Sequence, residues 1–306
     1  MKKIIHNFKA YRYLKMSRQR ALFLILKQVA CKFKIAPNYF SNLYDTVANN
    51  ELKRKWLIKS GSESFFNFNG AKLPDISASK EKMDSLRAML KDVFFIPCFY
   101  NENYDKSLVE CLDEYMPESP YGYTDGEFDV TVKNGDVVID AGAWIGDFSA
   151  YAATKNATVY AFEPIEETFE ILKKTAILND NKIIPIKKGL GDKEEIVTFS
   201  VSDSSLWTSM ALERDRQGER AQITTLDNFV NEHKLEKVSF IKADIEGAER
   251  DMLKGATNVL KKNAPKLVIC TYHLPDDKEV LERIILEANP NYKIVHLKHK
   301  LFAMVV

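Results

Sequence analysis

Short apolar runs alternate with amphipathic segments through the second half of this chain. The runs have the length of strands, and the segments between them repeat apolar residues every three to four positions, as helices do. This alternation predicts an α/β fold with a mostly parallel sheet covered by helices on both faces. The predicted strands are Val137–Ile139, Thr158–Phe162, Ile183–Lys187, Val238–Ala243 and Lys266–Tyr272, and the predicted helices are Asp147–Lys155, Glu166–Asn179, Ala248–Lys261 and Lys278–Glu287.

Two further patterns complete the outline of the chain. The apolar runs Tyr292–Leu297 and Leu301–Val306 predict an antiparallel hairpin that closes the sheet. The first part of the chain has mainly helical spacing, with one strong hairpin signal at Asn69-Gly70. We therefore expect a mainly helical region over residues 1–118 and an α/β domain over residues 119–306.

Polar residues stand where the predicted strands end. The carboxyl ends of parallel strands meet at one edge of a sheet, and ligands bind at that edge. We therefore expect these side chains to gather in one site. They are Asp140, Glu163, Asp192, Asp244, Glu246 and His273.

The segment from Val137 to Pro164 is predicted to form a strand, a glycine loop, a helix and a second strand. Its loop has the spacing D-x-G-x-x-x-G, with Gly142 and Gly146 after Asp140. This differs from the G-x-G-x-x-G of dinucleotide-binding proteins and lacks the G-K-[ST] of a P-loop. Glu163 ends the second strand, where a ribose-binding acid stands in nucleotide-binding α/β units.

Five segments in this order resemble the FkbM family of S-adenosylmethionine (SAM)-dependent methyltransferases, and the resemblance covers roughly residues 121–306. They are GDVVIDAGAWIGDFS (135–149), VYAFEP (159–164), ITTLDNF (223–229), FIKADIEGAERDMLKGA (240–256) and APKLVICTYHLPDD (264–277). The resemblance implies a Rossmann-like class I methyltransferase fold, with a seven-stranded sheet. It also implies transfer of a methyl group from SAM to an oxygen, often on a sugar, so we expect a small-molecule or glycan acceptor.

The resemblance implies roles for the residues of the first motif. We expect Asp140 and the loop amides to hold the amino acid end of SAM, and Glu163 to accept hydrogen bonds from the ribose hydroxyls. Asp192 suits the adenine amino group or, equally, a simple turn. The predicted cofactor-binding residues are Asp140, Gly142, Ala143, Gly146, Glu163 and Asp192.

Asp244, Glu246 and His273 are the predicted catalytic residues. Methyl transfer to a hydroxyl requires a group that aligns the acceptor and removes its proton. An ordinary His suits that role, Asp244 is the alternative base, and Glu246 alternatively fixes the Asp-x-Glu-Gly turn. Two carboxylates and a His also suit a divalent ion, but we favour a mechanism without a metal. Asp227 is predicted to cap the helix that starts at Asn228.

Charge is distributed unevenly along the chain. The overall formal charge is +1, yet residues 1–44 contain ten Lys or Arg and no acid. This basic arm suits either an anionic membrane surface or packing on its own protein or another subunit of a homo-oligomer, and we favour packing. No nucleic-acid-binding motif accompanies it.

The four cysteines lack C-x-x-C spacing, which argues against a metal site or a disulfide framework. They are typical of a reduced cytoplasmic protein. We expect this localisation, with peripheral contact at the inner membrane surface as a variant. Two other functions stay open at this point: an NAD-dependent oxidoreductase on a similar sheet, and a SAM-binding module without catalytic activity.

Overall fold

The computed structural model describes residues 46–47, 49–50, 52–54, 56–79, 82–83, 86, 121–125, 127–199, 219–297 and 299–306. The chain divides into two compact units, Met1–Phe68 with Asp75–Pro117 and Asn69–Pro74 with Glu118–Val306. The basic arm lies outside the described residues, so its membrane or subunit contacts stay predictions, as does the domain boundary at residue 118. No helix in the described part of the chain is long and apolar enough to cross a membrane.

The described part of the first unit contains an antiparallel pair of strands, β1 (Leu57–Ser60) and β2 (Glu63–Phe68). Beyond β2 the chain turns at Asn69 and Gly70, whose φ angles of 54° and 103° both lie in the left-handed region. Such angles are those of a tight hairpin turn. The Asn-Gly signal therefore marks a turn, as predicted.

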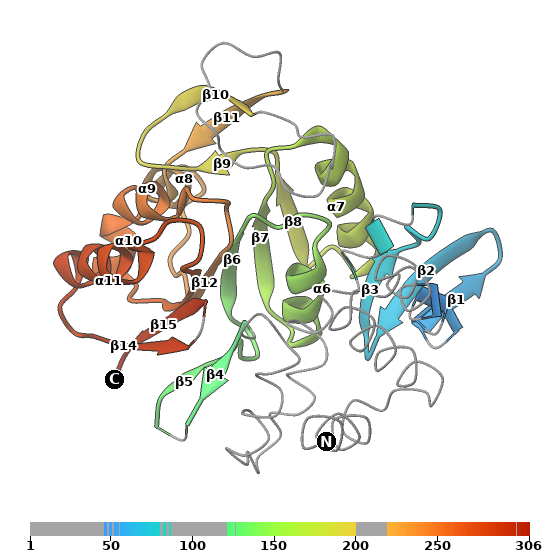
Figure 1. Ribbon diagram of the computed structural model, residues 1–306, viewed down its shortest axis with the longest axis horizontal. Coiled ribbons are helices and arrows are strands. Elements are labelled where there is room, and N and C mark those ends of the chain that lie inside the picture. Colours follow the sequence, from blue (N-terminus) through green and yellow to red (C-terminus); the bar gives the residue numbers. More distant parts are fainter. Residues whose placement is uncertain are drawn as a thin grey trace, which may run out of the picture. The chain divides into compact units, whose positions relative to one another are not determined.

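The second unit contains a seven-stranded sheet with the strand order β14-β15-β13-β12-β6-β7-β8 (Figure 1). The strands from β13 to β8 are parallel, and β15 pairs antiparallel with both β13 and β14. This confirms the predicted Rossmann-like sheet with a C-terminal antiparallel hairpin. The strands are β6 (Val137–Ala141), β7 (Thr158–Phe162), β8 (Ile183–Ile186), β12 (Phe240–Ala243), β13 (Lys266–Cys270), β14 (Tyr292–Leu297) and β15 (Lys300–Val305).

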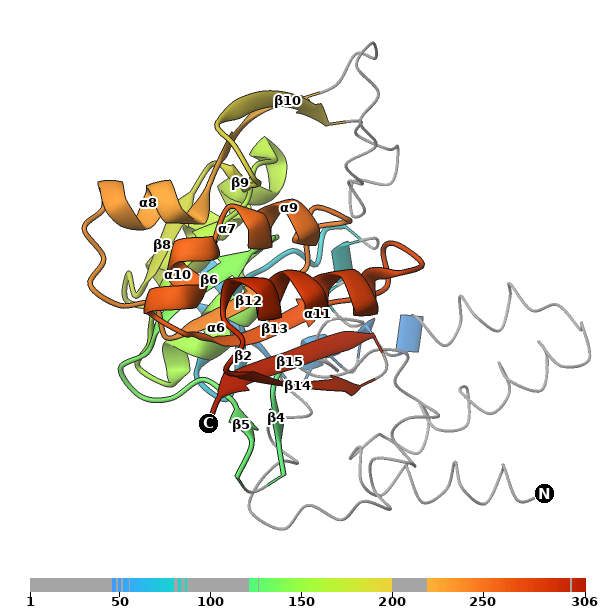
Figure 2. The same cartoon turned by 90° about the vertical axis from the view of Figure 1, so that its left-hand side faces the viewer.

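Two groups of helices flank this sheet (Figures 1 and 2). One group packs with the sheet into a large apolar core and contains α8 (Leu226–Glu232), α9 (Glu249–Lys254), α10 (Thr257–Lys262) and α11 (Asp277–Ala288). The other group, α6 (Asp147–Thr154) and α7 (Glu166–Leu178), also contacts β3 (Ala71–Pro74). The side chain of Asn179, at the end of α7, holds the backbone of Lys72 in β3 through two hydrogen bonds of 3.0 and 2.7 Å.

Smaller strands lie outside the main sheet. β4 (Tyr123–Thr124) and β5 (Asp129–Val130) form a short antiparallel pair. β9 (Gly189–Leu190), β10 (Glu195–Phe199) and β11 (Glu219–Thr224) form a separate three-stranded sheet. The predicted third strand ends at Ile186 in the structure, and residues 189–190 belong to the separate three-stranded sheet.

The predicted helix Ala248–Lys261 is wrong, because the structure has two helices, α9 and α10, with Gly255 and Ala256 between them. A Cβ added to Gly255 would lie 2.0 Å from the carbonyl oxygen of Gly191. The carbonyl oxygen of Gly255 accepts a hydrogen bond from the backbone N–H of Asp227, at 2.9 Å. Close packing of three chain segments at Gly255 thus interrupts the helix.

Asp227 is structural, as predicted, but it caps a different helix. Its carboxylate accepts the backbone N–H groups of Asn258 and Val259, at 2.9 Å each, at the start of α10. The helix that contains Asp227, α8, is capped by the Thr225 hydroxyl, which accepts from the N–H of Asn228. Both arrangements satisfy helix N–H groups that have no partner within their helix.

Candidate active site

The loop that follows β6 has an unusual backbone. Gly142, Trp144 and Gly146 all have φ angles in the left-handed region, of 72°, 49° and 86°. The N–H groups of Gly142 and Ala143 both donate to the carbonyl of Phe162, at 3.1 and 2.9 Å, which ties the loop to the end of β7. The loop therefore lies between the carboxyl ends of β6 and β7.

Both glycines of this loop have a packing role. A Cβ on Gly142 would lie 2.0 Å from the carbonyl oxygen of Asp244, and one on Gly146 would lie 2.7 Å from a methyl of Leu172. The loop thus packs directly on the turn after β12 and on α7. The predicted contacts of Gly142, Ala143 and Gly146 with a cofactor stay predictions.

Replacement of Gly142 by Ala is expected to destabilise the fold by about 2–5 kcal/mol, because it combines a left-handed φ angle with a backbone clash. Gly135 provides the matched control, since its φ is 78° and a Cβ there would meet nothing within 4 Å. Gly135→Ala should cost only about 1–2 kcal/mol. Urea unfolding of both variants measures the difference, and equal losses would contradict the packing role of Gly142.

Asp140 lies in β6, just before the loop, and is fully buried. Its carboxylate accepts from the Ser149 hydroxyl at 2.6 Å and lies 3.1 Å from the ammonium of Lys242. Lys242 also donates to the carbonyl oxygen of Gly142, at 2.7 Å. In this structure Asp140 supports the loop through Lys242. Its predicted contact with the amino acid end of SAM stays a prediction.

Glu163 extends from the end of β7 to the same loop. Its two carboxylate oxygens each accept one backbone N–H, from Trp144 at 2.9 Å and from Ile165 at 3.0 Å. Burial raises its pKa to about 7, against the opposing effect of these hydrogen bonds. The Thr168 side chain is a third hydrogen-bond partner of this carboxylate. A carboxylate oxygen has two acceptor positions, so Glu163 keeps one of four for a ligand.

Asp244 follows β12 and receives two phenolic hydrogen bonds. Tyr121 donates to its Oδ2 at 2.5 Å, and Tyr272 donates to its Oδ1 at 2.9 Å. Burial by itself would raise the pKa of Asp244, but the charges of Lys242 and Lys300 and the bond from Tyr121 together hold it below the ordinary value. Asp244 is therefore a carboxylate at neutral pH.

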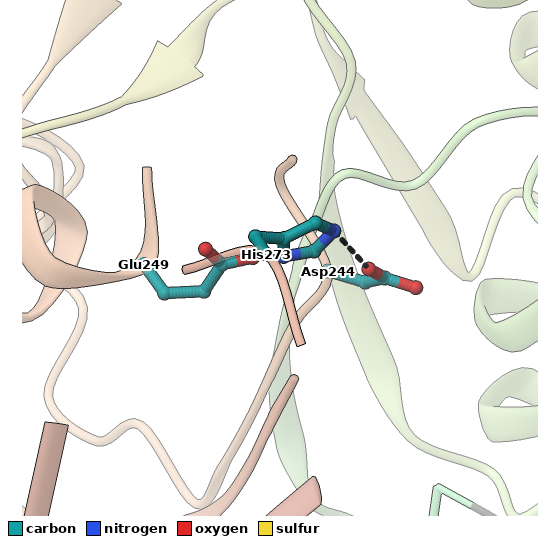
Figure 3. A group of neighbouring side chains, drawn as sticks. All are labelled: Asp244, Glu249 and His273. Carbon is teal, nitrogen blue, oxygen red and sulfur yellow. Dashed lines mark ion pairs between the residues drawn. The ribbon is translucent and has the colours of Figure 1, made fainter. Parts of the chain in front are cut away.

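His273, just after β13, lies among three carboxylates. Its Nδ1 is 3.0 Å from Glu249, and its Nε2 is 3.3 Å from Glu246 and 3.7 Å from Asp244. Figure 3 shows the ring between the carboxyl groups of Asp244 and Glu249. Burial opposes the charged ring, but Glu246 and Glu249 outweigh it and raise the pKa of His273 to about 10. At neutral pH the ring is a cation and has no free position for another proton.

Glu249 fixes the turn after β12, the role that the sequence analysis gave as the alternative for Glu246. Its carboxylate accepts the N–H groups of Ile245 and Gly247, at 2.9 and 3.0 Å, and so closes the turn after β12. Glu246 has a left-handed φ of 54°, and 28% of its side chain is exposed. Glu246 is therefore the acid of this cluster that is most open to a ligand.

Asp244, Glu249 and His273 form a group whose potential metal-ligand atoms lie within 4.8 Å of one another. Each ring nitrogen of His273 is closest to a different glutamate, which suits a doubly protonated ring. A metal ligand would instead need one unprotonated nitrogen. The mechanism without a metal stays a prediction.

Asp192 belongs to a different part of the fold from these residues. It follows β9 of the small sheet and is exposed. Its predicted contact with adenine stays a prediction.

Sequence patterns indicated neither Tyr121 nor Lys242 as site residues. Lys242 had a visible signal, because a charged residue inside the apolar run of β12 requires a buried counter-charge. Tyr121 had none, since it precedes the domain's first long strand and is 123 positions from Asp244.

Comparison with known proteins agrees with this architecture. The family model for the methyltransferase FkbM domain matches residues 140–294, just over half of the 306 residues. The hexuronic acid methyltransferase AglP of Haloferax volcanii is 28% identical over 54% of this chain and 67% of its own length. Methyltransferase 1 of Beauveria bassiana is 25% identical over 39% of this chain and 57% of its own length.

Among solved structures, the methyltransferase FkbM of Methylobacillus flagellatus aligns with a TM-score of 0.48 and 20% identity, over 86% of this chain and 60% of that one. The chain thus matches between about half and two thirds of the length of these proteins. The family match starts at Asp140, the first residue of the glycine-loop motif, and includes Glu163, Asp244 and His273. This chain belongs to the methyltransferase FkbM family.

Proposed function

We propose that this protein transfers a methyl group from SAM to a hydroxyl oxygen of a sugar or glycan. One observation carries the proposal: the loop 142–144 contacts both Glu163, the predicted ribose acid, and the turn that bears Asp244. A cofactor seated on this loop would therefore lie next to the carboxylate cluster. Family membership argues against the oxidoreductase alternative.

The residues present fit SAM. Glu163 keeps an acceptor position beyond its three internal partners, which suits a ribose hydroxyl. The indole N–H of Trp144 is buried and has no acceptor within the described residues, so it is available to a bound group. SAM supplies a positively charged sulfonium with a transferable methyl group.

Asp244 is the group that we propose takes the proton of the acceptor hydroxyl as the new carbon–oxygen bond forms. It is ionised, and it is held in place by Tyr121 and Tyr272. His273 already carries its proton at neutral pH, so the sequence-based proposal that it is the base is the weaker one. We assign His273 the role of holding Asp244 in position, and Glu246 that of contacting the acceptor.

A hydroxyl suits this site better than a carboxylate does. The relative from Haloferax volcanii is named as a hexuronic acid methyltransferase, and a hexuronic acid offers both kinds of oxygen. The exposed part of the cluster is the Glu246 carboxylate, which would repel a second carboxylate. A hydroxyl also needs a proton acceptor, and Asp244 is one.

The product distinguishes the two acceptors. The protein is incubated with isotope-labelled SAM and a panel of neutral sugars, hexuronic acids and glycans that contain them, and the labelled product is then treated with mild alkali. A methyl ether survives this treatment, whereas a methyl ester is hydrolysed. We expect label that resists alkali. Loss of the label would show a carboxylate acceptor, and SAM binding without any transfer would favour a module without catalytic activity.

Glu163→Gln is expected to weaken SAM binding about 10–100-fold, because hydrogen bonds to a charged carboxylate are each worth about 1.5–3 kcal/mol. Calorimetry at pH 8 measures it, where the Glu163 carboxylate is mostly ionised. Glu170→Gln is the matched control, since Glu170 is exposed on α7 and pairs only with Lys173 among the ion pairs of the described residues. Unchanged SAM affinity in Glu163→Gln would contradict the ribose role.

A further inference from the structure

Lys242 is a charged residue in the middle of a buried strand. It lies between Ile241 and Ala243 in β12, and only 4% of its side chain is exposed. Removing an ammonium group from water is costly unless several partners replace the water. The contacts that Lys242 makes should therefore show why the fold tolerates it.

Among the described residues, the hydrogen bonds and the ion pair of the Lys242 ammonium are with β6 and with the first residue of the loop that follows it. In the sheet, Lys242 is in register with Asp140 of β6. Its ammonium lies 3.1 Å from the Asp140 carboxylate, and it donates to the carbonyl oxygens of Gly142 at 2.7 Å and Ala141 at 3.4 Å. A single ammonium thus binds the end of β6 and the first residue of the loop.

Lys242 also faces the acceptor side of the site. Its ammonium lies 5.2 Å from the ring centroid of Tyr121, within the range of a cation–π contact. The hydroxyl of the same Tyr121 donates to Asp244 at 2.5 Å. The charges of Asp140, Asp244 and Asp147 all favour the protonated form of Lys242, and burial, the largest single effect, opposes it; the net result is a raised pKa.

We propose that Lys242 is a positioning residue that fixes the loop at Gly142 relative to Asp244. The inference rests on the proposed function, since this loop is the proposed seat of SAM and Asp244 the proposed base. By holding the Gly142 carbonyl, Lys242 sets the position of the Trp144 N–H that binds Glu163. Through Tyr121 the same side chain supports Asp244.

A simpler role must be distinguished from this one. In that role Lys242 only neutralises Asp140, because a buried carboxylate left without its partner destabilises a fold. The double variant Asp140→Asn with Lys242→Met removes both charges and therefore removes that penalty. It leaves the Gly142 carbonyl without its ammonium donor.

The experiment compares wild type, Asp140→Asn, Lys242→Met, Lys242→Arg and the double variant. Urea unfolding gives stability, calorimetry gives SAM affinity, and initial rates give kcat with the acceptor found for the wild type. Lys242→Met should be strongly destabilised. The double variant should regain most of the stability. Compared with Asp140→Asn alone, it should nevertheless bind SAM at least 10-fold more weakly and turn over at least 10-fold more slowly, so that any SAM contact of Asp140 itself cancels. Lys242→Arg keeps the charge but not the compact ammonium, and it should show the same weak SAM binding.

Every outcome decides between the two roles. A double variant with the SAM affinity and kcat of Asp140→Asn, or wild-type values in Lys242→Arg, would reduce Lys242 to a counter-ion and overturn the proposal. A double variant that does not fold would overturn it as well, because Lys242 would then be required for folding first. Failure of the wild type to bind SAM would instead refute the proposed function and is measured before the variants.

Discussion

Asp244→Asn is expected to lower kcat about 10²–10⁴-fold, the range that a positioned general base contributes. The amide has nearly the same shape as the carboxylate, and its oxygen can still accept from Tyr121 or Tyr272. It cannot take a proton from the acceptor hydroxyl. SAM affinity should stay within a few-fold of wild type, because Asp244 is not among the predicted cofactor-binding residues. Initial rates and calorimetry measure the two effects separately.

Asp251→Asn provides the control for this change. Asp251 lies in α9, is partly exposed, and pairs with Lys254 at 2.8 Å. Such surface pairs contribute little, so its kcat should match wild type. A kcat of Asp244→Asn within tenfold of wild type would show that Asp244 does not take the proton. Together with an alkali-labile product, that result would mean that the acceptor is a carboxylate, which needs no base.

The order of strands and helices was predictable because hydrophobic period is a local property of sequence. The interruption of the helix at Gly255 was not, because its cause is the Gly191 backbone that lies against it, 64 positions earlier in the chain. The separation of β9 from β8 has a similar origin. Gly189 and Leu190 pair with residues 223–224 of β11, and no local pattern indicates that pairing.

The strand-end rule located the site but did not separate the roles of its acids. It predicted that Asp140, Glu163 and Asp244 lie at one edge of the sheet, since this follows from parallel strands alone. It gave no information on burial. In the structure Asp140 is buried and has Lys242 as its ion-pair partner. The assignment of His273 as a base stays a prediction, but its premise has a related weakness. An unperturbed pKa was assumed for a ring that three carboxylates surround.

The pH dependence of stability tests the cationic state of His273. Its pKa is about 10 in the folded protein and about 6.5 in an unfolded chain. The stabilisation is fully present below about pH 6.5 and is lost as pH rises through about 10. Between these values, the folded protein retains a proton that the unfolded chain releases, so this residue's contribution to the unfolding free energy falls with rising pH.

His273→Gln should therefore be less stable than wild type by about 2–4 kcal/mol at neutral pH, and the difference should shrink towards pH 10. Urea unfolding of both proteins from pH 6 to 10 measures this difference, in which the titration of all other groups largely cancels. His296→Gln is the control, because His296 pairs with Glu282 at a partly exposed site and should contribute little at any pH. Parallel pH profiles for wild type and His273→Gln would mean that the folded ring is not a cation. His273 would then again be a candidate for the base, and the Asp244→Asn result would decide between them.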